Sequence, residues 1–197
     1  MIHFGNAFEK EGVLYVDACV FTHFEFGEEF GYTGPDSLFD PSLPEERGPQ
    51  RLVRIAIPEG AEEATWETMT PYGIDFPRFH PEHEGLDTPC LFGATRKDTR
   101  FSDPFDSLIR VDLQTEGFPT QLWTTEDNVF IGEPVFAPAE KEPSTGHILA
   151  IQSDGLNERT HLLIFDAASL DKGPITRIPF PLLPIAFHGD WDSGENR

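Results

Sequence analysis

Two of the seven histidines stand where they could do chemistry, and they lie near opposite ends of the chain. His3 lies in the segment IHFGNAFE (residues 2–9), and His188 lies in PIAFHGDW (residues 184–191). A neutral imidazole is a good ligand for ferrous iron, and histidine is the commonest metal-binding side chain. A lone histidine is more often a strand residue that hydrogen-bonds to a carbonyl, so the residue type alone leaves both interpretations open.

The elements that must position these histidines are predicted to be β-strands. Runs of β-branched and aromatic residues are separated by clusters of turn-forming residues, which is typical of an all-β sandwich, barrel or propeller. Residues 33–50 are dense in Pro, Gly, Asp and Glu and predict a long loop, and residues 70–99 are expected to be largely irregular. The predicted strands are residues 13–21, 51–57, 65–69, 90–94, 107–112, 120–124, 133–137, 147–153, 161–166 and 175–180.

The composition excludes several classes of function. With 35 acidic and 14 basic residues, the formal net charge of −21 repels phosphate backbones, so no nucleic-acid partner is expected. The 18 phenylalanines indicate a folded core rather than an acidic disordered chain. Cys19 and Cys90 have no metal-binding spacing and are expected to be free thiols in a reducing compartment. Because neither a signal peptide nor a membrane-spanning apolar run is visible, a cytoplasmic location is expected.

Several segments resemble one family, the carotenoid cleavage oxygenases, which includes carotenoid dioxygenases, stilbene-cleaving dioxygenases and the retinoid isomerase of the eye. Besides the two histidine segments, these are GVLYVDAC (residues 12–19), GEPVFAP (132–138), GHILA (146–150) and HLLIFDA (161–167). That family folds as a seven-bladed β-propeller, with one non-haem Fe(II) on its axis held by four histidines. The resemblance implies that residues 1–197 are the C-terminal blades of a single, partial propeller domain whose N-terminal blades are absent. At about four strands per blade, the chain would supply roughly three blades.

The resemblance also implies roles for four residues. His3 and His188 match the last two iron ligands of the family. Glu133 matches a glutamate that accepts the Nδ1–H of a ligand histidine and so fixes the orientation of the ring. Where the family has a second such glutamate in Glu-Phe-Pro, this chain has Asp75 in GIDFPR (residues 73–78), which is one methylene shorter. Two interpretations of Asp75 stay open: it reaches an imidazole, or it is a solvated acid.

The remaining histidines lack such a context. His80 and His83 form an HxxH pair, but Pro81 between them disfavours a helix that could present both to a metal. The other three are His23, His147 and His161.

The function implied is that of an Fe(II)-dependent dioxygenase. It would use O2 to cleave a conjugated C=C bond of an apolar polyene or stilbenoid substrate: a carotenoid, an apocarotenoid or a stilbene-like phenolic. With two of four ligands the chain alone is expected to be inactive and to need the N-terminal blades or a partner chain. A peripheral membrane contact of the full-length protein stays open, as does isomerisation in place of cleavage. The alternative is a non-catalytic β-rich binding or interaction domain that keeps the scaffold and binds no iron.

Overall fold

The computed structural model describes residues 3–20, 50–100, 104–139, 145–184, 188–192 and 194. These residues form antiparallel sheets and two short 3-10 helices, so the all-β prediction is confirmed. Neither of these helices, the ones found in the described ranges, is long and apolar enough to cross a membrane. The loop predicted at residues 33–50 lies outside the described residues except for its last residue, and His23 lies outside them too.

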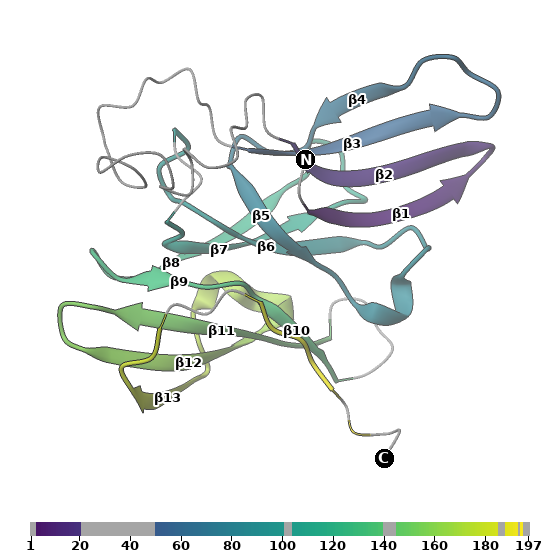
Figure 1. The fold of residues 1–197 in the computed structure, drawn as a ribbon. Helices are drawn as coiled ribbons and strands as arrows, with labels where there is room; N and C mark the ends of the chain where they lie inside the picture. The colour runs from purple at the N-terminus through teal and green to yellow at the C-terminus, as the bar shows by residue number, and fades with distance from the viewer. Residues whose placement is uncertain are drawn as a thin grey trace.

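Each sheet is built from consecutive strands, and Figure 1 shows the three sheets side by side. The first sheet contains β1 (Phe4–Lys10), β2 (Val13–Val20), β3 (Arg51–Pro58) and β4 (Thr65–Thr68). The middle sheet contains β5 (Ile74–Arg78), β6 (Cys90–Thr95), β7 (Ser107–Asp112) and β8 (Thr120–Thr124). The third contains β9 (Phe130–Ile131), β10 (Val135–Pro138), β11 (Gly146–Asp154), β12 (Arg159–Asp166) and β13 (Thr176–Pro181). The helices are η1 (Pro81–His83) and η2 (Ala167–Lys172).

Besides the two-residue β9, two strands lie where the sequence analysis expected none. β5 falls inside the stretch expected to be irregular, because Pro77 and a register shift interrupt the alternation that marks a strand. β1 is also a strand, although its small polar residues Gly5 and Asn6 carry little strand signal. Both additions matter, since β1 follows His3 directly and β5 contains Asp75.

The middle sheet is buried on both faces, so alternate residues of its strands enter two different cores. Leu91 and Ile109 pack with Leu52 of the first sheet. Phe92 and Leu108 pack with Phe165 and other apolar residues of the third sheet and of η2. A sheet buried on both sides reads as a continuous apolar run, as β6 does. This packing fixes the strands that hold the candidate site.

Candidate metal-binding site

His3 is held against Asp75 by two neighbouring strands. The carbonyl of His3 accepts a hydrogen bond from the backbone N–H of Cys19 at 3.0 Å, which fixes the start of β1 against β2. The Nδ1 atom of His3 lies 2.6 Å from Oδ1 of Asp75 on β5. Asp75 is 8% exposed, so its interpretation as a solvated acid is wrong, and the shorter side chain reaches the imidazole directly.

His188 is held against Glu133, in the connection between β9 and β10. The distance from Nδ1 of His188 to Oε2 of Glu133 is 3.2 Å, and the same oxygen accepts the backbone N–H of Gly189 at 2.9 Å. Arg78 donates from Nη2 to the other oxygen of Glu133 and to the carbonyl of Gly189. Glu133 is buried, unlike most glutamates at the start of a strand, which are exposed.

The two imidazole rings lie side by side although they come from opposite ends of the sequence. Their centroids are 5.6 Å apart, with the ring planes at 79°. The ring of Phe76 contacts both, at 5.0 Å from His3 and 5.5 Å from His188. On its other side Phe76 contacts Phe105 at 5.6 Å, which gives the histidine pair an apolar flank.

The donor set fits a metal bound through the Nε2 atoms. Each ring places Nδ1 against a carboxylate, which favours the tautomer with the proton on Nδ1 and the lone pair on Nε2, where a metal would bind. Imidazole nitrogens suit ferrous iron and other first-row metals. Among the described residues no group of three or more His, Cys, Asp or Glu could hold a metal, so this part of the chain offers a pair of donors.

The sequence analysis missed Phe76 and Arg78 as members of this site. Both follow Asp75 in the GIDFPR segment that had been singled out for its acid alone. In a regular strand, residues 75 and 78 would point to opposite faces, so sequence spacing gave no reason to group them.

The other described histidines lie away from this pair of rings. His80 is 1% exposed, precedes η1, and accepts the N–H of Glu82 on its Nδ1 at 3.2 Å. The ring of His83 lies 5.6 Å from the ring of His80. His147 is on the exposed start of β11. His161 lines the cavity described next.

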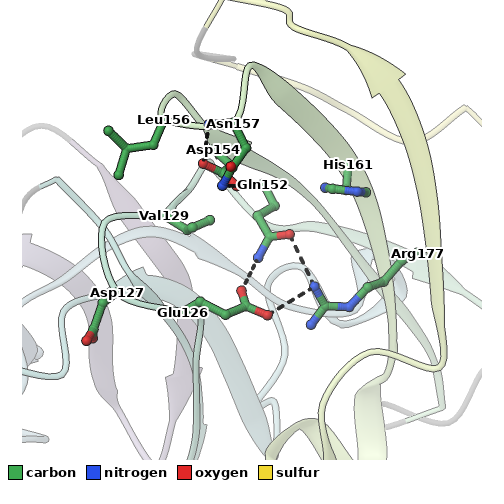
Figure 2. Close-up of a pocket in the computed structure, with 9 residues that line it drawn as sticks. All are labelled: Glu126, Asp127, Val129, Gln152, Asp154, Leu156, Asn157, His161 and Arg177. Atoms are coloured by element: carbon green, nitrogen blue, oxygen red, sulfur yellow. Dashed lines mark hydrogen bonds and ion pairs between the residues drawn. The ribbon is translucent and has the colours of Figure 1, made fainter.

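A polar cavity of about 320 Å³ lies at one end of the third sheet (Figure 2). Arg177 lies between Glu126, at 3.5 Å, and the amide oxygen of Gln152, at 3.3 Å. Asp154 accepts hydrogen bonds from both the backbone and the side chain of Asn157. Arg177, Glu126 and Gln152 thus bond to one another, and Asp154 bonds within its own turn, so these contacts are interpreted as structural.

The two described cysteines are free thiols, as expected, and both are buried. Burial raises the pKa of the Cys19 thiol well above its ordinary value, because a thiolate is poorly solvated there.

The described residues form an all-β protein in which two histidines, each beside a buried carboxylate, lie next to one another. Residues 1–193 match the family described as RPE65, retinal pigment epithelial membrane protein. The chain belongs to that family, and the resemblance to the carotenoid cleavage oxygenases is confirmed.

The curated relatives are named as dioxygenases. Carotenoid cleavage dioxygenase 7, chloroplastic, of Oryza sativa subsp. japonica is 27% identical over 216 residues, covering 96% of this chain and 35% of that protein. The Arabidopsis thaliana protein of the same name is 27% identical over 224 residues, covering 98% of this chain and 36% of that protein. Torulene dioxygenase of Fusarium fujikuroi is 29% identical over 130 residues, covering 62% and 22%. The chain thus spans about a third of the length of the carotenoid cleavage dioxygenases it matches.

Solved structures show the same fold. A mutant of Synechocystis ACO superposes with a TM-score of 0.83 at 23% identity, covering 96% of this chain and 39% of that one. An ACO/RPE65 chimera superposes with a TM-score of 0.83 at 22% identity, covering 96% of this chain and 39% of the chimera. Cobalt-substituted Synechocystis ACO gives 0.79 at 22% identity, covering 93% and 38%.

Proposed function

We propose that this chain is the C-terminal part of a non-haem Fe(II) dioxygenase that cleaves a conjugated C=C bond of a carotenoid or apocarotenoid, or of a stilbene-like substrate. The observation that carries the proposal is the pair of imidazole rings, 5.6 Å apart, each with a carboxylate on its Nδ1. The names of the relatives, which refer to carotenoid cleavage and torulene, favour the carotenoid substrates.

Four residues share the work at this site. His3 and His188 hold the iron through Nε2, while Asp75 and Glu133 keep each ring in one tautomer and orientation and increase its basicity. When bound, ferrous iron supplies the chemistry that lets O2 react with a conjugated double bond. The overall change is balanced: the C=C bond breaks, and each carbon takes one oxygen atom of O2 to give two carbonyl products.

An apolar flank suits the proposed substrate. Phe76 lies against both imidazoles, and Phe105 lies behind Phe76 and packs on the core between the middle and third sheets. A wall of this kind excludes water and contacts a polyene without offering polar partners.

The remaining ligands belong, in this proposal, to N-terminal blades that complete the same propeller domain. The presence of further blades is supported by an exposed apolar face on the first sheet. On this face, Leu14 and its cross-strand partner Ile57 are 42% and 37% exposed. Trp66 of β4, on the same face, is 68% exposed. An apolar sheet face of this kind calls for a covering layer. The length of the relatives leaves room for one.

The alternative of a non-catalytic β-rich domain has less support. A binding domain that holds no metal has no need for two buried carboxylates aimed at adjacent imidazoles, and burying acids without such a use is costly.

The test compares the 197-residue chain with a longer protein that includes any in-phase reading frame upstream of Met1. After anaerobic loading, the longer protein should retain one Fe(II) and cleave members of a carotenoid panel, with a stilbene panel run beside it. His3→Ala or His188→Ala should remove both iron and turnover. Iron and turnover that survive both substitutions would contradict the site. Stoichiometric iron with turnover from a 197-residue monomer would contradict the need for N-terminal blades.

A further inference from the structure

A bulge in β5 aims two side chains toward the histidine pair. The register of β5 with β6 shifts after Asp75, so that three residue steps on β5 match two on β6 before pairing resumes at Arg78. In an unbroken strand, residues three apart point to opposite faces. Here Asp75 contacts His3 while Arg78 contacts Glu133, because the inserted residue turns the chain between them.

The inserted turn is centred on Phe76, in a backbone conformation that aromatic residues rarely adopt. Its φ is 52°, in the left-handed region, which carries a conformational cost for a bulky side chain. Oδ1 of Asp75 accepts the Phe76 N–H at 2.9 Å and also contacts the ring of His3. One carboxylate oxygen therefore fixes both the bulge and the first histidine.

Arg78 is the link from this bulge to the second histidine. Its Nη2 donates to Oε1 of Glu133 and, at 2.9 Å, to the carbonyl of Gly189. The other oxygen of Glu133 takes the ring of His188 and the N–H of Gly189. The dipeptide 188–189 is thus held by its ring, its N–H and its carbonyl, and Arg78 contacts or supports all three.

His188 needs such anchoring because no strand carries it. It follows β13 in a segment without regular secondary structure, and its side chain is 51% exposed. The side chain of Glu133 is 6% exposed, so its charge depends on a cation in contact. Without Arg78, the carboxylate would lose that cation and the Gly189 carbonyl would lose its donor.

We propose that Arg78 is a positioning residue for His188, acting through Glu133 and Gly189, and that the β5 bulge sets the spacing of both imidazoles. The statement that this spacing serves metal binding rests on the proposed function. The anchoring of residues 188–189 stands independently of it.

The first experiment measures amide hydrogen exchange at Gly189 in the 197-residue chain. Arg78→Met should speed exchange of this amide by about tenfold, the effect of losing roughly one hydrogen bond's worth of local stability. Arg78→Lys, which keeps a charged donor on a shorter side chain, should fall between wild type and Arg78→Met. The matched control is Arg177→Met, which removes an arginine–glutamate pair with Glu126 elsewhere, and it should leave Gly189 unchanged.

The second experiment makes the same three substitutions in the longer protein that includes an in-phase upstream reading frame, titrates these variants and the longer wild type with Co(II), and follows visible absorption. Arg78→Met should weaken Co(II) binding by about 10- to 100-fold, as loss of a group that orients a ligand does, and Arg78→Lys should restore part of it. Faster exchange at Gly189 with no Co(II) binding by any protein, wild type included, would support the anchoring and contradict the proposed function.

Three results would overturn the role of Arg78. Unchanged exchange in Arg78→Met would remove the anchoring. Equal acceleration in Arg177→Met would show general loosening of the fold. Faster exchange with unaltered Co(II) affinity would show that Arg78 holds the segment without positioning the ligand.

Discussion

The two histidine–carboxylate pairs reach the same place by different structural means. His3 and Asp75 stand at neighbouring strands, the contact is 2.6 Å long, and the His3 side chain is 26% exposed. His188 lies outside any strand, its contact with Glu133 is 3.2 Å long, and its side chain is 51% exposed. The first pair is held by a sheet, and the second by a cluster of side-chain and backbone bonds.

This difference shows two ways in which the fold can hold a histidine in place. His3 directly precedes β1, and the backbone bond from Cys19 ties it to β2, so one carboxylate contact completes its position. Residues 188–189 make three contacts with Glu133 and Arg78. A change confined to one set of contacts should therefore affect its own histidine more than the other.

The largest effect is expected from breaking the ion pair between Asp17 on β2 and Arg54 on β3. Asp17 is fully buried and accepts two hydrogen bonds from Arg54, both at 2.8 Å. Arg54→Met would leave the buried Asp17 carboxylate without its arginine partner and lower the free energy of unfolding by about 3–5 kcal/mol. Denaturant unfolding measures the loss, and exchange at Gly189 should change less than exchange in β1 and β2. Equal acceleration in both places would mean that the two halves are one unit.

The next effect compares the carboxylates themselves. Asp75→Asn and Glu133→Gln keep an acceptor but lose the charge, and each should weaken metal binding by about 10- to 100-fold. Glu133→Gln should cost more, because the contacts of Arg78, the His188 ring and the Gly189 N–H all go to that carboxylate. In Asp75→Asn, the backbone bond from Cys19 still holds His3. Metal titration of both variants ranks them, and a larger loss in Asp75→Asn would reverse the assignment of which half is better supported.

A smaller effect is expected from adding a methyl group at Gly93 of β6, which packs against β5. A Cβ on Gly93 would lie 2.5 Å from Cγ2 of Ile74 and 3.0 Å from the carbonyl of Asp75. Gly93→Ala should therefore cost about 1–3 kcal/mol and displace the His3–Asp75 half. Gly155→Ala is the control, because no atom lies within 4 Å of its added Cβ. Thermal unfolding of the two variants gives the comparison, and equal melting temperatures would show that β5 yields without strain.

Much of the strand pattern could be predicted from sequence, because alternation and turn residues are local signals. The predicted strands at residues 107–112 and 120–124 coincide with β7 and β8. β5 was missed because its bulge and Pro77 destroy the period of two that identifies a strand. The sheet packing that buries Asp75 is a tertiary property, so the sequence left its role open.

The members of the candidate site could be named from sequence where a resemblance pointed to them, and not where their contacts depend on the fold. His3, His188 and Glu133 were found from segments like those of the family, and the structure brings them together. Arg78 had no such signal, because its place beside Glu133 depends on the left-handed turn at Phe76. A positive φ at an aromatic residue cannot be read from a single sequence.

The smallest effect is expected from Glu126, which forms an ion pair with Arg177 away from the two histidines. The pKa of Glu126 is lowered first by a hydrogen bond from its own backbone N–H and then by the Thr125 hydroxyl, with Arg177 adding to the effect. A lowered pKa means that the ionised form favours the folded state. The contribution is therefore present above the unfolded value of about 4.3 and is lost as pH falls through the folded value. Because the Glu126 side chain is 63% exposed, the free energy of unfolding of wild type should exceed that of Glu126→Gln by less than about 1 kcal/mol at neutral pH. The difference should vanish toward about pH 3.

Urea unfolding at several pH values measures this difference. An advantage that grows on acidification would contradict the sign, and a change in Gly189 exchange would tie this arginine–carboxylate pair to the site after all.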